Sequence, residues 1–200
     1  KVKDSFLDTL KSYIEKFNYQ PDAAHYTRII NDRNFDRLLK LIDQEKVFYG
    51  GKSDASSKYI EPTLLHKVTW ADAVMQEEIF GPILPVLTFK NFNEALLQIA
   101  KGEKPLSAYL FTNDSEEKEH FISKISFGGG CINDVVMHLS NDNLPFGGVG
   151  TSGIGNYHGK FGFDAFSHQK AILSRVTWGE PDLKYPPYSD KKLHWIKKLL

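Results

Sequence analysis

The second half of the chain alternates between short apolar stretches and amphipathic stretches, and this order most constrains the fold. Residues 83–89 and 107–112, and the apolar stretch that begins at Cys131, are rich in β-forming side chains. Residues 91–102 and 113–125 separate them and have the composition of capped helices. Strands that alternate with helices predict an α/β fold, in which helices cover a parallel sheet.

The first half adds two helices and further strands. Residues 3–17 carry apolar side chains at helical spacing, and a second helix follows Asn31 or Asp32, either of which suits an N-cap. The β-rich stretches on either side of residues 52–58 predict short strands around a turn. Pro85 has no N–H to donate to a neighbouring strand, so we expect its strand to be bulged or to lie at an edge.

The C-terminal part of the chain differs from the rest in composition. Residues 171–177 predict one more strand. The chain from Trp178 onward has three prolines and then a short basic amphipathic end. We expect this tail to run over the surface or to dock on a partner subunit.

Composition and charge exclude several classes of protein. The 25 Lys and Arg residues balance the 25 Asp and Glu residues, so nothing indicates the basic surface that a nucleic-acid partner would favour. The single Cys excludes an internal disulfide, and the seven His are too scattered to predict a metal site. We therefore expect a reducing compartment and a cytoplasmic location.

A glycine-rich loop, LPFGGVGTSGIG, contains the pattern G-x-G-x-x-G at Gly148, Gly150 and Gly153. In a dinucleotide-binding fold this pattern follows a buried strand directly and opens a helix. Here a polar turn with Pro145 precedes it. The context favours glycines that permit close backbone packing and positive φ angles over a phosphate cradle.

Cys131 follows three glycines and is a candidate nucleophile. A reactive thiol needs a base, a cation or a helix N-terminus to lower its pKa. The sequence names no such partner, and Cys131 begins an apolar stretch. A buried, inert thiol is the favoured interpretation.

Two longer motifs occur in a fixed order: QEEIFGPILPVLTF at residues 76–89, and the glycine loop with its continuation NYHGKFGFDAFSHQKAI. Together with PLSAYLFT between them, they closely resemble the C-terminal half of the aldehyde dehydrogenase superfamily. RIINDRNFDRLLKLI, YIEPTLL and YHGKFGFDAFSHQK resemble its class 3 branch, which includes the fatty aldehyde dehydrogenases. The resemblance covers nearly the whole chain.

The resemblance implies an αβα core with a parallel sheet and a division of the chain into two regions. Residues 1–168 would form the C-terminal part of the catalytic domain. Residues 169–200 would form an oligomerisation strand and a C-terminal tail, which implies a homodimer. The family oxidises aldehydes to acids through a Cys thiohemiacetal and a thioester, with NAD or NADP as the hydride acceptor.

The resemblance also implies which residues bind the cofactor and the aldehyde. Glu78 matches the family glutamate that accepts hydrogen bonds from the nicotinamide ribose, and Phe80 matches the aromatic residue beside the nicotinamide. Phe146 matches a residue that lines the aldehyde tunnel. Met137 and Leu139 belong to a variable loop that shapes substrate choice, and their apolar side chains fit an apolar aldehyde.

The chain departs from the family in one important respect. Its cysteine, Cys131, does not match the family nucleophile. The resemblance places that cysteine, the general-base glutamate and the dinucleotide-binding domain before residue 1. We therefore expect no catalytic residue in this chain and no aldehyde oxidation by it alone.

Other interpretations stay open at this point. The chain could belong to a branch that acts on a semialdehyde, or it could be a non-catalytic interaction module derived from the same fold. The basic C-terminal end could contact a membrane surface, because Leu193, Ile196 and Leu200 make an apolar stripe among lysines.

Overall fold

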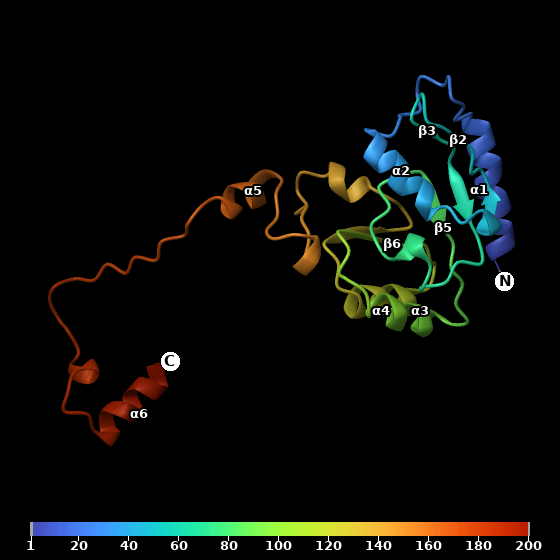
Figure 1. Cartoon of the computed structure of the whole chain (residues 1–200). Helices are drawn as coiled ribbons and strands as arrows, with labels where there is room; N and C mark the ends of the chain where they lie inside the picture. Colours follow the sequence, from blue (N-terminus) through green and yellow to red (C-terminus); the bar gives the residue numbers. More distant parts are fainter. Residues whose placement is uncertain (1, 200) are drawn as a thin grey trace. The chain divides into compact units, whose positions relative to one another are not determined.

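The computed structural model describes residues 2–199, which form two compact units that divide after Gly102 (Figure 1). We call them the N-terminal unit and the C-terminal unit. The boundary at residue 168 that the sequence indicates stays a prediction. Within residues 2–199, no helix combines the length and the apolar character that crossing a membrane requires.

The N-terminal unit is built on a three-stranded sheet with the order β1-β4-β5. Strand β1 (Val47–Tyr49) runs antiparallel to β4 (Thr63–Leu65), and β4 runs parallel to β5 (Ile83–Pro85). Pro85 therefore lies in an edge strand, as predicted. Strands β2 (Ser53–Asp54) and β3 (Tyr59–Ile60) form a separate hairpin.

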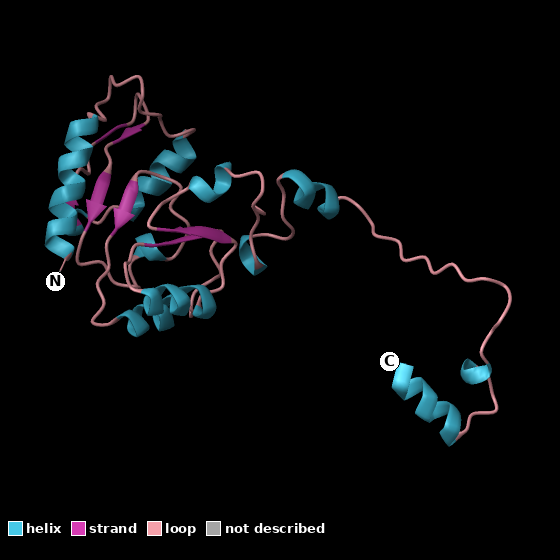
Figure 2. Ribbon diagram, turned by 180° about the vertical axis from the view of Figure 1, so that it is seen from behind, coloured by secondary structure: helices cyan, strands magenta, loops and turns pink. Residues whose placement is uncertain are grey.

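Helices α1 (Lys3–Phe17), α2 (Asp32–Leu41) and α3 (Phe92–Ile99) complete this unit. Figure 2 shows the strands of the sheet between α1 and α2. Asn31 caps α2, because its Oδ1 accepts a hydrogen bond of 2.9 Å from the backbone N–H of Asn34. The apolar face of α2 packs with Ile60, Leu65 and Ile83 in the main core.

The C-terminal unit contains a parallel pair of strands, β6 (Ser107–Leu110) and β7 (Gly129–Ile132), joined through α4 (Ser115–Lys124). The predicted order of strand, helix, strand, helix and strand from β5 to β7 is confirmed. Short helices follow: η3 (Met137–Ser140), η4 (Gly150–Ser152), α5 (Gly159–Ala165), η5 (Asp182–Lys184) and α6 (Asp190–Leu199).

Two sequence predictions about strands are wrong. The segment after Cys131 does not stay extended, because β7 ends at Ile132 and η3 begins five residues later. Residues 171–177 form no strand within the described chain. A strand needs a hydrogen-bonded neighbour, and no described residue pairs with this segment.

Candidate functional site

The turn that leads into β5 presents the two residues predicted to bind a cofactor. Glu78 is exposed, and the Phe80 side chain is 79% exposed. Phe80 also has a positive φ of 45°, which a bulky side chain rarely adopts. Such a conformation costs on the order of 1–3 kcal/mol and persists only where surrounding contacts hold it.

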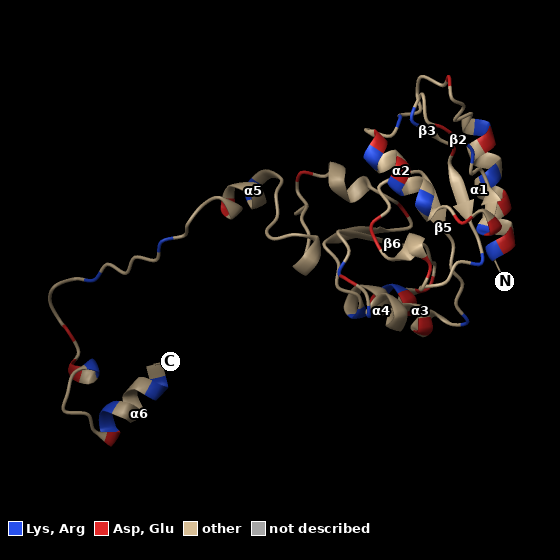
Figure 3. Ribbon diagram, in the orientation of Figure 1, with Lys and Arg blue, Asp and Glu red and all other residues tan. Residues whose placement is uncertain are grey.

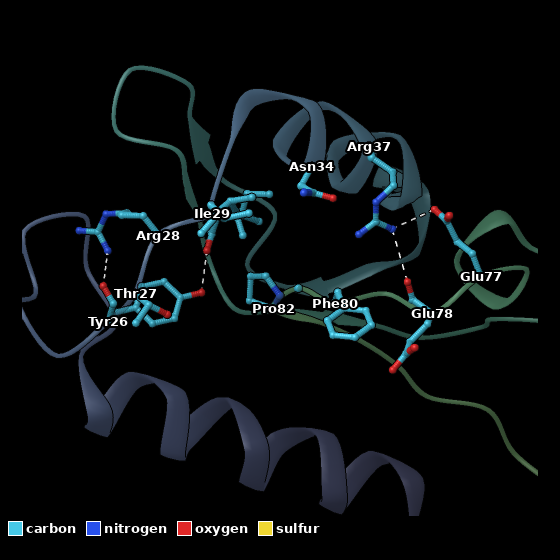
Figure 4. Close-up of a pocket in the computed structure, with 13 residues that line it drawn as sticks. Tyr26, Thr27, Arg28, Ile29, Asn34, Arg37, Glu77, Glu78, Phe80 and Pro82 are labelled. Carbon is cyan, nitrogen blue, oxygen red and sulfur yellow. Dashed lines mark hydrogen bonds and ion pairs between the residues drawn. The ribbon is translucent and has the colours of Figure 1, made fainter. Parts of the chain in front are cut away.

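Arg37, on α2, supplies several of these contacts (Figure 4). Its Nη2 donates a hydrogen bond of 2.6 Å to the carbonyl oxygen of Ile79. Its Nη1 donates to the carboxylate of Glu77 at 3.0 Å and to the carbonyl oxygen of Glu78 at 3.5 Å. One guanidinium therefore holds the backbone on both sides of Ile79.

Gly81 and Pro82 attach the turn to the rest of the unit. A Cβ added to Gly81 would lie 2.5 Å from Cδ2 of Leu38, so only glycine lets the backbone approach α2 this closely. The carbonyl oxygen of Pro82 accepts a hydrogen bond of 2.8 Å from the N–H of Thr63 in β4. The turn is thus fixed by both α2 and the sheet.

A pocket of about 640 Å³ opens beside this turn within the N-terminal unit. Its lining combines two arginines, two glutamates and several apolar side chains: Tyr26, Thr27, Arg28, Ile29, Ile30, Asn34, Arg37, Ile60, Glu77, Glu78, Phe80, Gly81 and Pro82. The Glu78 carboxylate points away from Arg37 (Figure 4). Among residues 2–199 it takes part in no hydrogen bond or ion pair, so both of its oxygens are free to accept hydroxyl groups.

Phe146, predicted to line an aldehyde tunnel, lies in an aromatic cluster of the C-terminal unit. Its ring centroid lies 6.0 Å from that of His138, 5.6 Å from that of Tyr157 and 5.9 Å from that of His158. A backbone bridge joins Phe146 to Tyr157 through hydrogen bonds of 3.0 and 2.8 Å. The ring is half-buried and held in place from several sides.

Met137 and Leu139 lie on η3, on either side of His138. His138 is buried, whereas Met137 is 57% exposed and Leu139 is 37% exposed. The imidazole thus packs inward toward Phe146, and the two apolar side chains face outward. The structure leaves both of them free to meet an apolar ligand.

The glycines of the loop permit close backbone packing, as the sequence predicts. A Cβ on Gly147 would lie 2.1 Å from the carbonyl oxygen of Gly155, and one on Gly148 would lie 2.1 Å from that of Ser152. The pattern opens the three-residue 3₁₀ turn η4 rather than an α-helix. The loop therefore lacks the strand–turn–helix geometry of a dinucleotide site.

Cys131 differs from its prediction. It lies within β7 and is only half-buried, with its Sγ 3.6 Å from Nδ1 of His138. Ser107 Oγ lies 3.4 Å from the other ring nitrogen of His138. The expectation of a buried thiol without a basic neighbour is wrong, because η3 folds His138 back onto β7. Among the described residues, no group of three His, Cys, Asp or Glu side chains is placed to hold a metal ion.

Sequence reasoning missed Arg37 entirely. Its hydrogen-bond partners lie 40 to 42 residues further along the chain, and nothing in the local pattern of α2 distinguishes it from the other charged residues there. The Glu77 carboxylate pairs with Arg37, so its contact in this structure is structural.

Comparison with known proteins decides what kind of molecule this is. A model of the aldehyde dehydrogenase family matches residues 1–172. The chain belongs to the aldehyde dehydrogenase family. Among curated proteins, it is 47% identical to an aldehyde dehydrogenase of Craterostigma plantagineum, over 97% of this chain and 42% of that protein. It is 46% identical to aldehyde dehydrogenase family 3 member H1 of Arabidopsis thaliana, over 97% of this chain and 41% of that protein.

Solved structures agree with this membership. The substrate-bound state of an aldehyde dehydrogenase, AldH, of Staphylococcus aureus matches with a TM-score of 0.90 and 46% identity, over 99% of this chain and 44% of that chain. The NAD-dependent aldehyde dehydrogenase of Sinorhizobium meliloti matches with a TM-score of 0.77 and 25% identity, over 90% of this chain and 37% of that chain. The resemblance to the class 3 branch is confirmed, and this aldehyde dehydrogenase chain spans about two-fifths of the length of the curated relatives it matches.

Proposed function

We propose that this chain forms the cofactor-positioning turn and part of the aldehyde-binding wall of an NAD- or NADP-dependent aldehyde dehydrogenase. The observation that carries the proposal is the turn at Glu78–Phe80. It presents a free carboxylate and an exposed ring beside a pocket, and it is held by α2 and β4.

Glu78 would accept hydrogen bonds from the two hydroxyls of the nicotinamide ribose, a task that suits a carboxylate with both oxygens free. Phe80 would pack against the nicotinamide and restrict its orientation. The bound cofactor supplies the hydride acceptor for oxidation of the aldehyde to an acid. The contribution of these residues is to position the cofactor, and correct positioning is a large part of the rate enhancement in such reactions.

On the aldehyde side, Phe146 would line the path to the reacting carbon, with Met137 and Leu139 forming an apolar entrance. The held Phe146 ring and the exposed side chains on η3 support this assignment. An apolar, fatty-type aldehyde is the substrate class that fits these side chains.

The cofactor assignment is tested by replacing Glu78 in the full-length enzyme that carries this chain. Glu78→Gln keeps the size of the side chain but removes its charge, so we expect the Kd for NAD to rise about tenfold. Calorimetric titration measures this change. Glu45→Gln, which alters an exposed glutamate on η1 (Gln44–Lys46), is the matched control. Unchanged NAD affinity in Glu78→Gln would contradict the assignment.

We also propose that these 200 residues alone do not oxidise aldehydes, because Cys131 lies in β7 rather than in a motif that matches the family nucleophile. Mixing the purified chain with NAD and an aliphatic aldehyde should give no increase in absorbance from NADH. Turnover that survives Cys131→Ala would show that the chain holds a nucleophile of another kind.

The location and the surface contacts of the protein are further proposals. A cytoplasmic enzyme fits the single free thiol. Figure 3 shows α6 largely in the colour of Lys and Arg, and Leu193 and Trp195 of the same helix are exposed, which supports a peripheral contact with an anionic membrane. Co-sedimentation with phosphatidylserine vesicles, with and without residues 190–200, tests that contact.

A further inference from the structure

We propose that Arg37 is a positioning residue for the nicotinamide end of the cofactor. It acts through the backbone of the turn at Glu78–Phe80 rather than by contact with the ligand. The inference rests on the proposed function of the turn at Glu78–Phe80.

The hydrogen bonds of Arg37 reach the two peptide groups that set the directions of the Glu78 and Phe80 side chains. Nη2 binds the carbonyl oxygen of Ile79, which belongs to the peptide that leads into Phe80. Nη1 binds the carbonyl oxygen of Glu78, in the preceding peptide. Rotation of the Ile79–Phe80 peptide would change the positive φ of Phe80, and rotation of the Glu78–Ile79 peptide would change the backbone at Glu78, so the two hydrogen bonds hold the backbone beside each side chain.

Glu77 keeps the guanidinium directed at the backbone. Its carboxylate pairs with Nη1 of Arg37 at 3.0 Å, and the Arg37 side chain is 26% exposed, so the pair is partly shielded from solvent. Because Glu77 offsets the positive charge, Arg37 does not capture the neighbouring carboxylate of Glu78. That carboxylate points away from Arg37 and stays available to a ligand (Figure 4).

The geometry requires arginine rather than any cation. A guanidinium is a planar fork with five N–H donors, which can serve two carbonyls and a carboxylate at once. A lysine ammonium is a single point charge on a flexible stem and would keep the attraction to Glu77 while losing the fixed directions. We therefore expect the Kd for NAD of Arg37→Lys to lie between that of the native enzyme and that of a variant without a cation at this position.

The experiment compares binding of NAD with binding of ADP in the full-length enzyme that carries this chain. ADP lacks the nicotinamide and its ribose, so it cannot report on Glu78 or Phe80. We expect Arg37→Met to raise the Kd for NAD about tenfold and to leave the Kd for ADP unchanged. Arg37→Lys should give a smaller rise, and it supplies the same comparison if Arg37→Met does not fold. Arg33→Met, which removes an exposed arginine from the same helix, is the matched control and should change neither constant.

Two results would overturn the inference. An unchanged Kd for NAD in Arg37→Met, with weakened binding in Glu78→Gln, would show that the turn keeps its shape without Arg37. Equal rises in the Kd for NAD and the Kd for ADP, together with a lowered Tm, would show that Arg37 has a general structural role. If Glu78→Gln binds NAD normally, the assignment of Glu78 fails. A rise in the Kd for NAD but not for ADP in Arg37→Met would then show that Arg37 acts on the cofactor through Phe80.

Discussion

Glu77 and Glu78 are adjacent and chemically identical, and the backbone of the turn gives them different roles. The carboxylate of Glu77 turns toward α2 and pairs with Arg37 at 3.0 Å. The carboxylate of Glu78 points to the open side of the turn, and only its backbone oxygen is engaged by Arg37. At the scale of single residues, side-chain direction rather than residue type determines which of the two carboxylates is left without a partner in the described chain.

Gly81 gives a direct test of how closely the turn must approach α2. Gly81→Ala would place a methyl group 2.5 Å from Leu38, which is fully buried, so we expect the free energy of unfolding to fall by about 1–3 kcal/mol. Urea denaturation measures the change. At Gly102, an added Cβ has its nearest neighbour at 3.4 Å, so Gly102→Ala is the control. Equal losses in both variants would show that the approach to Leu38 is not tight.

At the scale of elements, one ionic contact ties η1 to the segment that leads toward the turn. The Lys46 ammonium lies 2.7 Å from the carboxylate of Asp72, which precedes η2 (Ala73–Met75). The backbone N–H and the hydroxyl of Thr69 also donate to that carboxylate. These contacts hold the beginning of residues 69–78, and Glu78 lies at the end of that segment.

This contact predicts a loss of stability in acid. The hydrogen bond from Lys46 and those from Thr69 lower the pKa of Asp72 below its ordinary value of 3.8. The folded state therefore binds this proton less readily than the unfolded state. The stabilisation is present above pH 3.8 and is lost as the pH falls through the lower folded pKa.

Urea denaturation between pH 5 and pH 2.5 measures the effect, over a range of about one pH unit on either side of the ordinary Asp pKa. The free energy of unfolding should fall less steeply with acid in Asp72→Asn than in the native chain. Asp36→Asn, which removes an exposed carboxylate from α2, should reproduce the native slope. The same slope in Asp72→Asn and the native chain would rule out this linkage.

At the scale of the whole molecule, the segment between α5 and η5 leaves apolar side chains in solvent. Ile172 and Leu173 are 78% and 94% exposed, and no described residue pairs with residues 171–177 as a strand. Unpaired extended segments tend to add to the edge of a sheet in another copy of the chain. The homodimer implied by the sequence resemblance stays a proposal, and this segment is its candidate contact.

Light scattering tests the proposed association. We expect the apparent mass of the native chain to rise with concentration, because self-association would cover Ile172 and Leu173. The double variant Ile172→Glu, Leu173→Glu should remain monomeric, because a buried charge at a strand interface is costly. Ser167→Glu together with His168→Glu adds the same charge just outside the segment and should associate like the native chain. A native chain that stays monomeric at high concentration would contradict the proposal.

Much of the fold follows from local patterns in the sequence. The spacing of apolar residues places α1 and α2, Asn31 caps α2, and Pro85 restricts β5 to an edge, because each signal acts within a few residues. The motif around Glu78 and Phe80 likewise identifies the turn. The polar turn before the glycine loop indicates that its glycines serve close backbone packing. Local hydrogen bonding and steric limits are enough for these predictions.

Tertiary structure alone decided the contacts between distant segments. Arg37 meets Glu77 and Ile79 across about 40 residues, and no local pattern encodes that meeting. His138 reaches Cys131 because η3 interrupts a segment that looked extended, which makes the thiol half-buried beside an imidazole. Residues 171–177 have strand-like composition, but a strand forms only where a partner supplies the hydrogen bonds. The sequence by itself determined most of the helices and strands, the family motif and the position of the turn, whereas the fold decided which predicted strands form and what holds that turn in shape.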